Sequence, residues 1–438
     1  MSDSTQTPQW ADTNTDQGET NWYACLVWGL GVFFYFYEFM LQTSTGVMVP
    51  DLMRAFNATG EQIGNLSAFY LYGYAPMQIV AGLLMDRVGP RRLFTLASLF
   101  CALGSLLFVY AAPSLTFAYL ARGLMGVGGS FAVVGCLKLA AIWFSPSRFA
   151  FLAGIMVAVG MLGAAGGQAP MAELVRNWGW ENTMLLGAIV GFLLCPVMWY
   201  LMKPPAGQSE IDPQNAGLSI GQLLSSLLKV MRSRDSWVAS IYAGLMFVPT
   251  LGFGGLWGIP FLAEAYDVSR TNAALIISAI YLGWAAGGPV FGWISDSLGR
   301  RKPPLSIATV GVLISMIYIY LVPETVTLMV IALFLLGVFS SGFVLAFSVV
   351  RELNPPELTG TSMGFINTLN TLSGAVAQPL LGRMLDHQWS GQLHDGARVY
   401  ALEAYRSSLV SVVVCIIVAL LMVPFIKETF CKSAYEKH

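Results

Sequence analysis

Long apolar runs, separated by short polar segments, recur along the whole chain. Each run has about 20 or more residues, and a helix of that length, rising about 1.5 Å per residue, crosses the hydrocarbon core of a bilayer. The runs are too long, and alternate too little between apolar and polar positions, for the strands of a membrane barrel. The pattern predicts twelve spans, at residues 22–49, 62–85, 92–111, 114–142, 148–173, 180–202, 237–263, 271–295, 303–322, 325–350, 359–385 and 402–426.

The longest polar interruption, residues 203–236, divides the predicted spans six and six. We therefore expect an all-α integral membrane protein with two pseudo-symmetric six-helix bundles, residues 22–202 and 237–427, joined by a cytoplasmic linker at 203–236. Residues 1–21 are polar and contain no Lys or Arg. They are predicted to form a disordered tail rather than a signal peptide, and residues 428–438 are predicted to form a second tail.

Composition supports a membrane protein. Of the 438 residues, 56% are hydrophobic and only 11% are charged, whereas about 25% of the residues of a soluble domain are charged. Of the 23 Lys and Arg residues, fifteen fall in one set of loops and tails and six at the opposite ends of the spans. Because basic residues are retained on the cytoplasmic side, both termini are predicted to be cytoplasmic, in an inner or plasma membrane.

The six cysteines are scattered without CxxC spacing, and the three histidines lie outside the spans. This distribution predicts no metal site and no cofactor. The bilayer is the expected partner of such a chain. No nucleic acid is expected to bind, and the chain is expected to be a monomer.

One loop occurs twice. The segment GLLMDRVGPRR (82–92) follows the second predicted span, and GWISDSLGRRK (292–302) follows the eighth. An aspartate at a helix end can stabilise the N-terminus of a neighbouring helix, glycine permits a tight turn, and arginines offer forked donors to carboxylates. We predict that the two loops form a conformational latch, consisting of Gly82, Asp86, Arg87, Gly89, Arg91, Arg92, Gly292, Asp296, Gly299, Arg300 and Arg301. The alternative is that these arginines only satisfy the positive-inside rule.

The first span carries a glutamate, Glu38, near its middle. A charge at that depth costs about 2.5–3.5 kcal/mol on insertion scales, so it generally has a partner. Among the Lys and Arg residues, only Arg122 and Lys138 lie well inside predicted spans. Lys138 is close enough to the end of its span for its long side chain to reach the surface. Arg122 is therefore the predicted partner of Glu38. The two residues are predicted to couple a proton to transport, with a permanent structural ion pair as the alternative.

Two patterns in this sequence resemble the major facilitator superfamily. The repeated loop is similar to its G-x-x-x-D-x-x-G signature, although Pro90 stands where a basic residue is usual and Ser297 stands where the first copy has Arg87. The segment RGLMGVGG, beginning at Arg122, resembles a second motif of many proton-coupled members, in which this arginine lies near an acid on the first helix. The resemblance implies secondary transport by alternating access, with two bundles rocking around a central site.

Polar residues at helical spacing mark candidate substrate contacts. Tyr35, Glu38 and Gln42 share one face of the first span. The predicted substrate-binding residues are Tyr35, Gln42, Tyr70, Tyr74, Gln78, Trp257, Asn367, Asn370 and Gln378. Interhelical hydrogen bonding without substrate contact is an equal alternative for each amide. Trp257 lies in PTLGFGGLWGIP, where closely spaced glycine and proline weaken a helix; this segment is predicted to be a gate, with close helix packing as the alternative.

Together these features predict a proton-coupled secondary transporter, not an enzyme, for a small polar organic solute such as an organic anion, a sugar derivative, an amino acid or a short peptide. Proton-driven efflux of amphipathic drugs or metabolites is the alternative within the same class. A non-transporting membrane receptor or scaffold is the alternative from another class.

Overall fold

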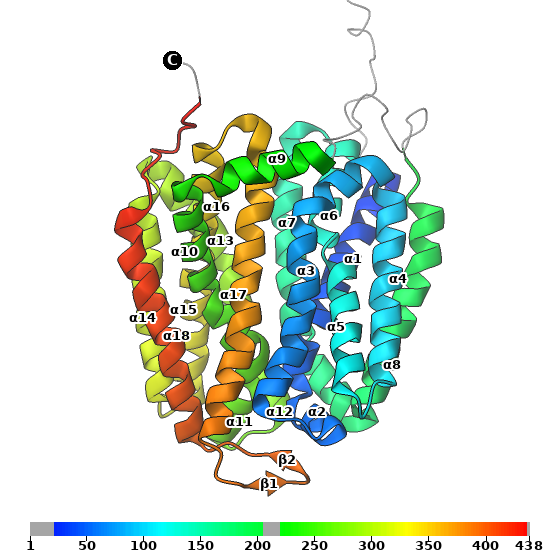
Figure 1. Cartoon of the computed structure of the whole chain (residues 1–438), viewed down its shortest axis with the longest axis vertical. Helices are drawn as coiled ribbons and strands as arrows, with labels where there is room; N and C mark the ends of the chain where they lie inside the picture. Colours follow the sequence, from blue (N-terminus) through cyan, green and yellow to red (C-terminus); the bar gives the residue numbers. More distant parts are fainter. Residues whose placement is uncertain (1–21, 205–219, 436–438) are drawn as a thin grey trace, which may run out of the picture.

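The predicted apolar runs form long α-helices that lie side by side (Figure 1). The computed structural model describes residues 22–204 and 220–435. In the first half the helices are α1 (Trp22–Val47), α2 (Val49–Phe56), α3 (Gly60–Val88), α4 (Pro90–Val109), α5 (Leu115–Gly129), α6 (Ala132–Trp143), α7 (Pro146–Gly166) and α8 (Ala169–Leu201). The predicted tail at 1–21, part of the predicted linker (205–219) and residues 436–438 lie outside the described residues.

The second half begins with α9 (Ile220–Met231) and continues through α10 (Arg234–Val248), the π-helix η2 (Pro249–Trp257), α11 (Gly258–Tyr266), α12 (Arg270–Ile277), α13 (Ala279–Leu298), α14 (Lys302–Leu321) and α15 (Val326–Ser340). It ends with the short 3₁₀ turn η3 (Ser341–Phe343), α16 (Val344–Leu353), η4 (Pro356–Leu358), α17 (Thr359–His387), strands β1 (Leu393–His394) and β2 (Ala397–Arg398), α18 (Leu402–Met422) and η5 (Val423–Phe425). The two strands pair antiparallel.

Ten stretches of the described residues are long and apolar enough to cross a membrane. One of them, Phe151–Leu201, contains both the predicted span 148–173 and the predicted span 180–202, and its helical geometry breaks at Gly179, where φ is 81°. Helix α17 coincides with the predicted span 359–385 but is not among the ten. Its run of amide and hydroxyl side chains makes it more polar than the other spans.

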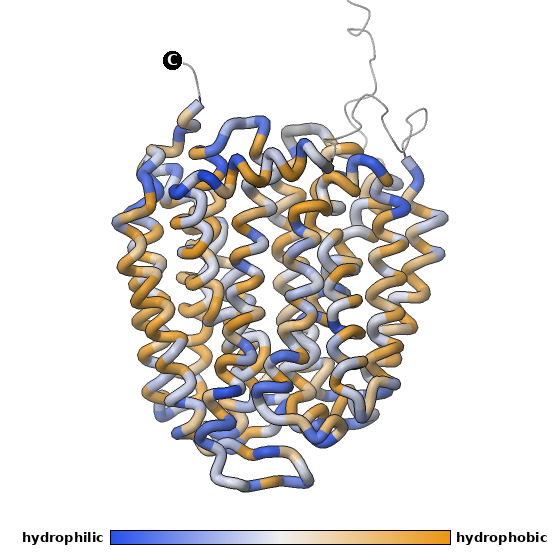
Figure 2. The backbone as a smooth tube through the Cα atoms, viewed as in Figure 1, coloured by the Kyte–Doolittle hydropathy of each residue, from blue (hydrophilic) through white to orange (hydrophobic). Residues whose placement is uncertain are grey.

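The outside of the bundle is apolar and its two ends are polar (Figure 2). Large apolar side chains stand exposed along the helices, as with Trp293 at 71% and Leu421 at 65%. Such an apolar exterior is stable only against lipid, so the chain is a multi-pass membrane protein. We call the end with α9 the upper face and the end with the β1–β2 hairpin the hairpin face (Figure 1).

The two halves meet along a seam between α3 and α17 (Figure 1). Helix α3 begins with a capping box, in which Thr59 and Gln62 exchange side-chain and backbone hydrogen bonds. Glycine is required where the backbones touch, because a Cβ at Gly64 would lie 2.5 Å from the Gln378 carbonyl oxygen, and one at Gly382 would lie 2.2 Å from that of Gly60. The seam is therefore closed by main chain rather than by large side chains.

Two segments differ from regular α-helix near the centre. The glycine- and proline-rich run predicted to be a gate stays helical but is π-wound over Pro249–Trp257, and all nine residues are buried. The predicted fourth span is interrupted at Ser130 and Phe131, between α5 and α6. Within the predicted linker, α9 lies across the upper face (Figure 1), where Val230 packs with Leu358 and Phe365.

Candidate functional site: a buried carboxyl group and the seam beside it

Glu38 lies inside the first half, on α1, and its side chain is only 1% exposed. Its Oε1 accepts a hydrogen bond from the Tyr70 hydroxyl at 2.8 Å, and its Oε2 has no partner. Gly129 makes room for this contact, since a Cβ there would lie 2.3 Å from the Tyr70 oxygen and 2.5 Å from Glu38 Cγ. The glycines that follow Arg122 thus let a phenol and a carboxyl group meet inside the bundle.

Arg122 is fully buried, but it does not form the predicted ion pair with Glu38. Its Nη1 donates to the Leu41 carbonyl at 2.8 Å, and its Nη2 donates to the Gln42 carbonyl at 3.2 Å. Its guanidinium carbon lies 4.9 Å from the centre of the Tyr70 ring. Tyr70 therefore contacts both charged groups, and backbone carbonyls of α1 take the place of the carboxylate as acceptors for the arginine.

This arrangement has a direct electrostatic consequence. A buried carboxylate with an unpartnered oxygen is costly in a low-dielectric site, and binding of a proton at Oε2 removes that cost. The Nη1 and Nη2 groups of Arg122 bond to carbonyls and its guanidinium lies over an aromatic ring, while its Nε is buried without a partner; the partners that stabilise its charge therefore do not include the Glu38 carboxylate. Glu38 can therefore change protonation state without leaving Arg122 unpartnered.

The predicted amides Gln78 and Asn367 meet across the seam. Asn367 Nδ2 donates to Gln78 Oε1 at 2.9 Å, and Gln78 Nε2 donates to the carbonyl of Ser130 at 3.1 Å. Ser130 lies in the break that follows Gly129. A hydrogen-bonded chain therefore runs from α17 of the second half to the segment beside Glu38.

The predicted residues Gln378 and Trp257 meet at the π-helix. Trp257 Nε1 donates to the Gln378 carbonyl at 2.9 Å, and Gln378 Nε2 donates to the Leu251 carbonyl, also at 2.9 Å. Gln378 Oε1 is buried without a partner. A cavity of about 10 Å³, roughly the volume needed by one water molecule, lies here between the halves and is lined by Gln42, Thr43, Ser67, Leu71, Leu251, Gly255 and Gln378.

The predicted substrate residues thus separate into two groups. Tyr35, Tyr70 and Tyr74 lie with Glu38 in the first half, where Tyr35 packs against Gly160 and the Tyr74 ring stacks on that of Tyr70. The second group lies along the seam and includes Gln42, Gln78, Trp257, Asn367 and Gln378. Asn370 is also buried, and its Oδ1 has no partner.

The first copy of the repeated loop makes its ion pair within the first half. Asp86 Oδ1 accepts from Lys138 Nζ at 2.7 Å, so the lysine predicted only to extend toward the surface has a specific partner. Arg91 Nε donates to the Trp199 carbonyl at 2.7 Å. Gly89, with φ at 85°, supplies the left-handed turn, whereas Gly82 has open space around it.

The second copy forms a larger network within the second half. Arg301 contacts Asp296 at 2.8 Å and Glu352 at 2.6 Å. Burial alone would lower the pKa of Arg301, but the hydrogen bonds that Arg301 donates to Glu352 and Asp296 outweigh it and raise that pKa above its usual value. Gly299, with φ at 62°, makes the turn here, and Gly292 again has open space around it.

The C-terminal segment joins this network. Glu428 accepts from the backbone N–H groups of Arg301 at 2.8 Å and Lys302 at 3.0 Å, which caps the N-terminus of α14. Burial favours the neutral acid, but these backbone donors prevail and lower the pKa of Glu428. Arg300 lies 5.9 Å from the centre of the Phe430 ring.

The hairpin face holds functional candidates that the sequence analysis missed. Asp386, near the end of α17, accepts hydrogen bonds from the backbone N–H groups of Gly60 at 2.9 Å and Glu61 at 2.8 Å, at the start of α3. Arg398 and the Tyr400 hydroxyl donate to the same carboxylate. Asp51 contacts Arg270, and Glu173 accepts from Thr271 at 3.2 Å. The contacts of Asp386 with the start of α3, of Asp51 with Arg270 and of Glu173 with Thr271 join the two halves.

A sequence signal for Asp386 existed. The spacing Gly-x-x-x-Asp, which relates Gly82 to Asp86, also relates Gly382 to Asp386. Tyr281 is a second missed residue, and its hydroxyl accepts from Gln168 Nε2 at 3.2 Å across the halves. Among residues 22–204 and 220–435, no group of three His, Cys, Asp or Glu side chains is placed to hold a metal ion.

Comparisons with known proteins agree with this architecture. The family model described as Major Facilitator Superfamily matches residues 29–257 and 250–430. The chain is 24% identical to the membrane sensor protein UhpC of Salmonella typhimurium, over 94% of this chain and 92% of that protein. It is 22% identical to the probable sulfoacetate transporter SauU of Cupriavidus necator, over 84% of this chain and 89% of that protein. A crystal structure of a bacterial homolog of the human lysosomal transporter Spinster, in an inward-facing and occupied conformation, superposes with a TM-score of 0.75 at 18% identity, covering 92% of this chain and 97% of that chain.

Proposed function

This chain belongs to the Major Facilitator Superfamily, and we propose that it is a secondary active transporter that couples a small polar organic solute to protons by alternating access. Glu38 is the proton-binding residue in this proposal; Tyr70 donates a hydrogen bond to its carboxyl group, and Arg122 lies over the Tyr70 ring. The two halves rock about the α3–α17 seam. The upper face is the cytoplasmic one, in keeping with the uneven distribution of Lys and Arg.

One observation carries the proposal: Glu38 is buried next to a cation that is stabilised without it. A permanent structural ion pair would hold the two charges in contact, because a buried charge is stable only with a partner. Here Arg122 bonds to carbonyls instead, and one carboxyl oxygen of Glu38 is free to bind a proton. The alternative of a fixed ion pair is the less favoured one for this geometry.

The solute is proposed to bind between the halves, beside the cavity lined by Gln42 and Gln378. The amide oxygen of Gln378 is unpartnered there and offers an acceptor, which suits a solute with hydroxyl or amino donors. An organic anion is the first class to test, because SauU, a relative, is named as a probable sulfoacetate transporter.

The test uses protein reconstituted in liposomes that contain a pH-sensitive dye. A panel of sulfoacetate, a sugar acid, a hexose, an amino acid and a dipeptide is added outside, and luminal pH is recorded for wild type, Glu38→Gln and the control Glu181→Gln, which removes an exposed carboxylate. We expect one solute to acidify the lumen in wild type and in the control, but not in Glu38→Gln. Solute uptake that acidifies the lumen equally in Glu38→Gln would overturn the role of Glu38.

A second function is favoured by one specific observation. UhpC, a relative matched over most of both chains, is named a membrane sensor protein. A sensor has to bind its ligand but need not move it across the membrane. Radiolabelled members of the same panel distinguish the two functions. Binding to purified protein without accumulation in liposomes at any imposed pH gradient would support the sensor, whereas accumulation would exclude it.

A further inference from the structure

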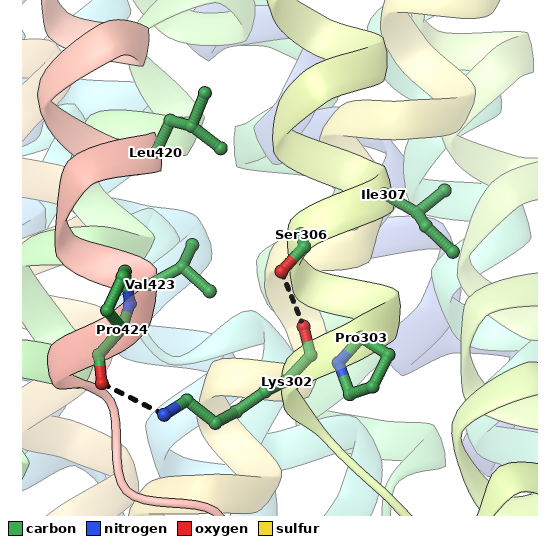
Figure 3. A pocket seen from close by; sticks show the side chains of 7 residues that line it. All are labelled: Lys302, Pro303, Ser306, Ile307, Leu420, Val423 and Pro424. Carbon is green, nitrogen blue, oxygen red and sulfur yellow. Dashed lines mark hydrogen bonds between the residues drawn. The ribbon is translucent and has the colours of Figure 1, made fainter.

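A groove opens on the outside of the second half, where α14 and α18 separate near the upper face. Its volume is about 620 Å³, and it is lined by Lys302, Pro303, Ser306, Ile307, Leu420, Val423 and Pro424 (Figure 3). This volume is within the range of about 300–1,000 Å³ that is usual for sites of small organic ligands. Ile307 is 53% exposed and Leu421, on the adjoining turn, is also exposed, so the groove opens toward the lipid and not toward the seam.

Lys302 is the one basic residue among the groove's lining residues. Its side chain extends from the first turn of α14 toward the segment that follows α18, where Nζ donates to the Pro424 carbonyl at 2.9 Å (Figure 3). Among the described residues, no carboxylate lies within 4 Å of this ammonium group. An ammonium group has three donors and only one is used here, so two remain for an oxygen-rich anion.

The acidic groups nearest in the chain are engaged elsewhere. Glu428 accepts from the backbone N–H groups of Arg301 and Lys302, and Asp296 and Glu352 bond to the Arg301 side chain. The positive charge of Lys302 is therefore not cancelled by a direct ion pair. Arg300 and Lys427 are exposed on the same face, but neither lines the groove.

A second groove on the opposite leaflet provides a natural comparison. It measures about 520 Å³ and lies along α8 near the hairpin face, and it is lined by Asn177, Trp178, Asn182, Leu185, Leu186 and Ile189. Its size and apolar wall are similar, but its lining contains amides and an indole and no cation. Both grooves suit a lipid tail, and only the one at the upper face suits an anionic head group.

We propose that the α14–α18 groove binds an anionic glycerophospholipid of the leaflet at the upper face. Lys302 contacts the phosphate at the mouth of the groove. Ile307, Leu420 and Val423 contact the acyl chains. Basic pockets between membrane helices on the cytoplasmic side are known to hold anionic head groups, and the inference stands independently of which solute the protein transports.

The test measures lipid selectivity of the full-length protein. Protein purified in detergent is exchanged with phosphatidylglycerol or phosphatidylcholine of identical acyl chains, and bound lipid is counted by native mass spectrometry. We expect wild type to prefer phosphatidylglycerol by about fivefold, the effect of one basic residue near an anionic lipid surface. Lys302→Gln should reduce this preference to near unity, and Lys302→Arg should retain it.

Two controls make the result specific. Lys427→Gln removes an exposed charge on the same face that does not line the groove, and it should leave the preference unchanged. Ile307→Trp fills the apolar part of the groove and should reduce the binding of both lipids. Glycerol phosphate, which has the head-group charge without acyl chains, should not displace the bound lipid.

The proposal is overturned if Lys302→Gln keeps the wild-type preference, if Lys427→Gln loses it equally, or if glycerol phosphate displaces the lipid. Thermal unfolding of each variant in phosphatidylcholine identifies a folding defect. If Lys302→Gln is unstable, photo-crosslinking of wild type with an azido-phosphatidylglycerol replaces it. Crosslinks within residues 302–307 and 420–424 support the site, and crosslinks confined to other segments contradict it.

Discussion

The two faces of this protein use charged residues in different ways. At the hairpin face, Asp386, Asp51 and Glu173 each contact a residue of the other half. At the upper face, two groups of ion pairs, Asp86 with Lys138 and Arg301 with Asp296 and Glu352, each stay within one half. The difference indicates that these three carboxylates hold the halves together at the hairpin face, while the two named groups of ion pairs at the upper face stabilise each half separately.

The largest effect is expected from Asp386, because its carboxylate accepts from four donors and connects α17 to the start of α3. A hydrogen bond to a charged group contributes about 1.5–3 kcal/mol, and about 1.4 kcal/mol changes an equilibrium tenfold. Asp386→Ala should therefore raise the reactivity of a cysteine at position 67, beside the small cavity, by about tenfold or more. The measurement uses a membrane-impermeant thiol reagent applied at the hairpin face, with the six native cysteines replaced by serine.

Asp395→Ala is the matched control for this experiment. Asp395 is an exposed carboxylate of the same hairpin, and its Oδ2 lies 3.6 Å from Nε2 of His394. The Asp395→Ala variant should leave the reactivity of position 67 unchanged. Asp386→Asn, which keeps one acceptor oxygen, should give an intermediate reactivity. Equal reactivity in wild type and Asp386→Ala would show that the hairpin face is closed by packing alone.

A smaller effect of the same sign is expected at Asp51 and Arg270, which are partly exposed. Pairs of this kind contribute about 0.2–1 kcal/mol, so Arg270→Ala should raise the reactivity of position 67 by about two- to fivefold. A double-mutant cycle with Asp51→Ala measures the coupling. Arg54→Ala breaks the bond between Arg54 and Asp51 inside the first half and leaves Arg270 in place; if it has the same effect as Arg270→Ala, the ion pair between the halves is not the cause.

At the upper face, we expect substitution of the Asp86–Lys138 pair to lower the stability of the protein and to leave the contact between the halves unchanged. Asp86→Asn and Lys138→Met should each lower the midpoint of thermal unfolding by about 1–3 °C, because the pair is partly exposed and contributes up to about 1 kcal/mol. In the double variant the midpoint of thermal unfolding should fall no further than in either single variant. Lys229→Met, at an exposed site on α9, is the control. Increased reactivity of position 67 in Asp86→Asn would contradict the distinction between the two faces.

The smallest effect is a pH dependence of the C-terminal segment. Because its pKa is lowered in the folded state, Glu428 contributes stability that is complete above its unfolded pKa of about 4.3 and that is lost as pH falls through the lower folded value. A nitroxide label at position 432 should keep the same mobility from pH 8 to about pH 5 and become mobile below about pH 4.

Glu428→Gln tests the assignment of that transition. The label should be mobile at every pH in this variant, because the neutral amide is a weaker cap for α14, and Glu403→Gln should behave like wild type. A transition near neutral pH, or one that persists in Glu428→Gln, would mean that another group controls the segment.

Helix positions followed from the sequence because each apolar run is a local signal. The turn glycines Gly89 and Gly299 were predictable for the same reason, and both have positive φ. The partner of Arg122 was not predictable, since the preference of its donors for the Leu41 and Gln42 carbonyls depends on where Tyr70 packs. The Gly-x-x-x-Asp spacing could have marked Asp386 as a candidate, but its contacts to Gly60 and Glu61 join residues more than 300 positions apart, and a local pattern does not identify such distant partners.

The placement of Glu38 and Arg122 also has an electrical consequence. With Glu38 ionised, the two buried side chains carry no net charge; with Glu38 protonated, they carry one positive charge. A charge that moves across the whole membrane field gains or loses about 2.3 kcal/mol per 100 mV. If the proton binds at Glu38, the membrane voltage therefore acts on the protonated form of this pair and leaves the ionised form nearly unaffected, so that a single buried carboxyl group makes the transport cycle sensitive to voltage as well as to pH.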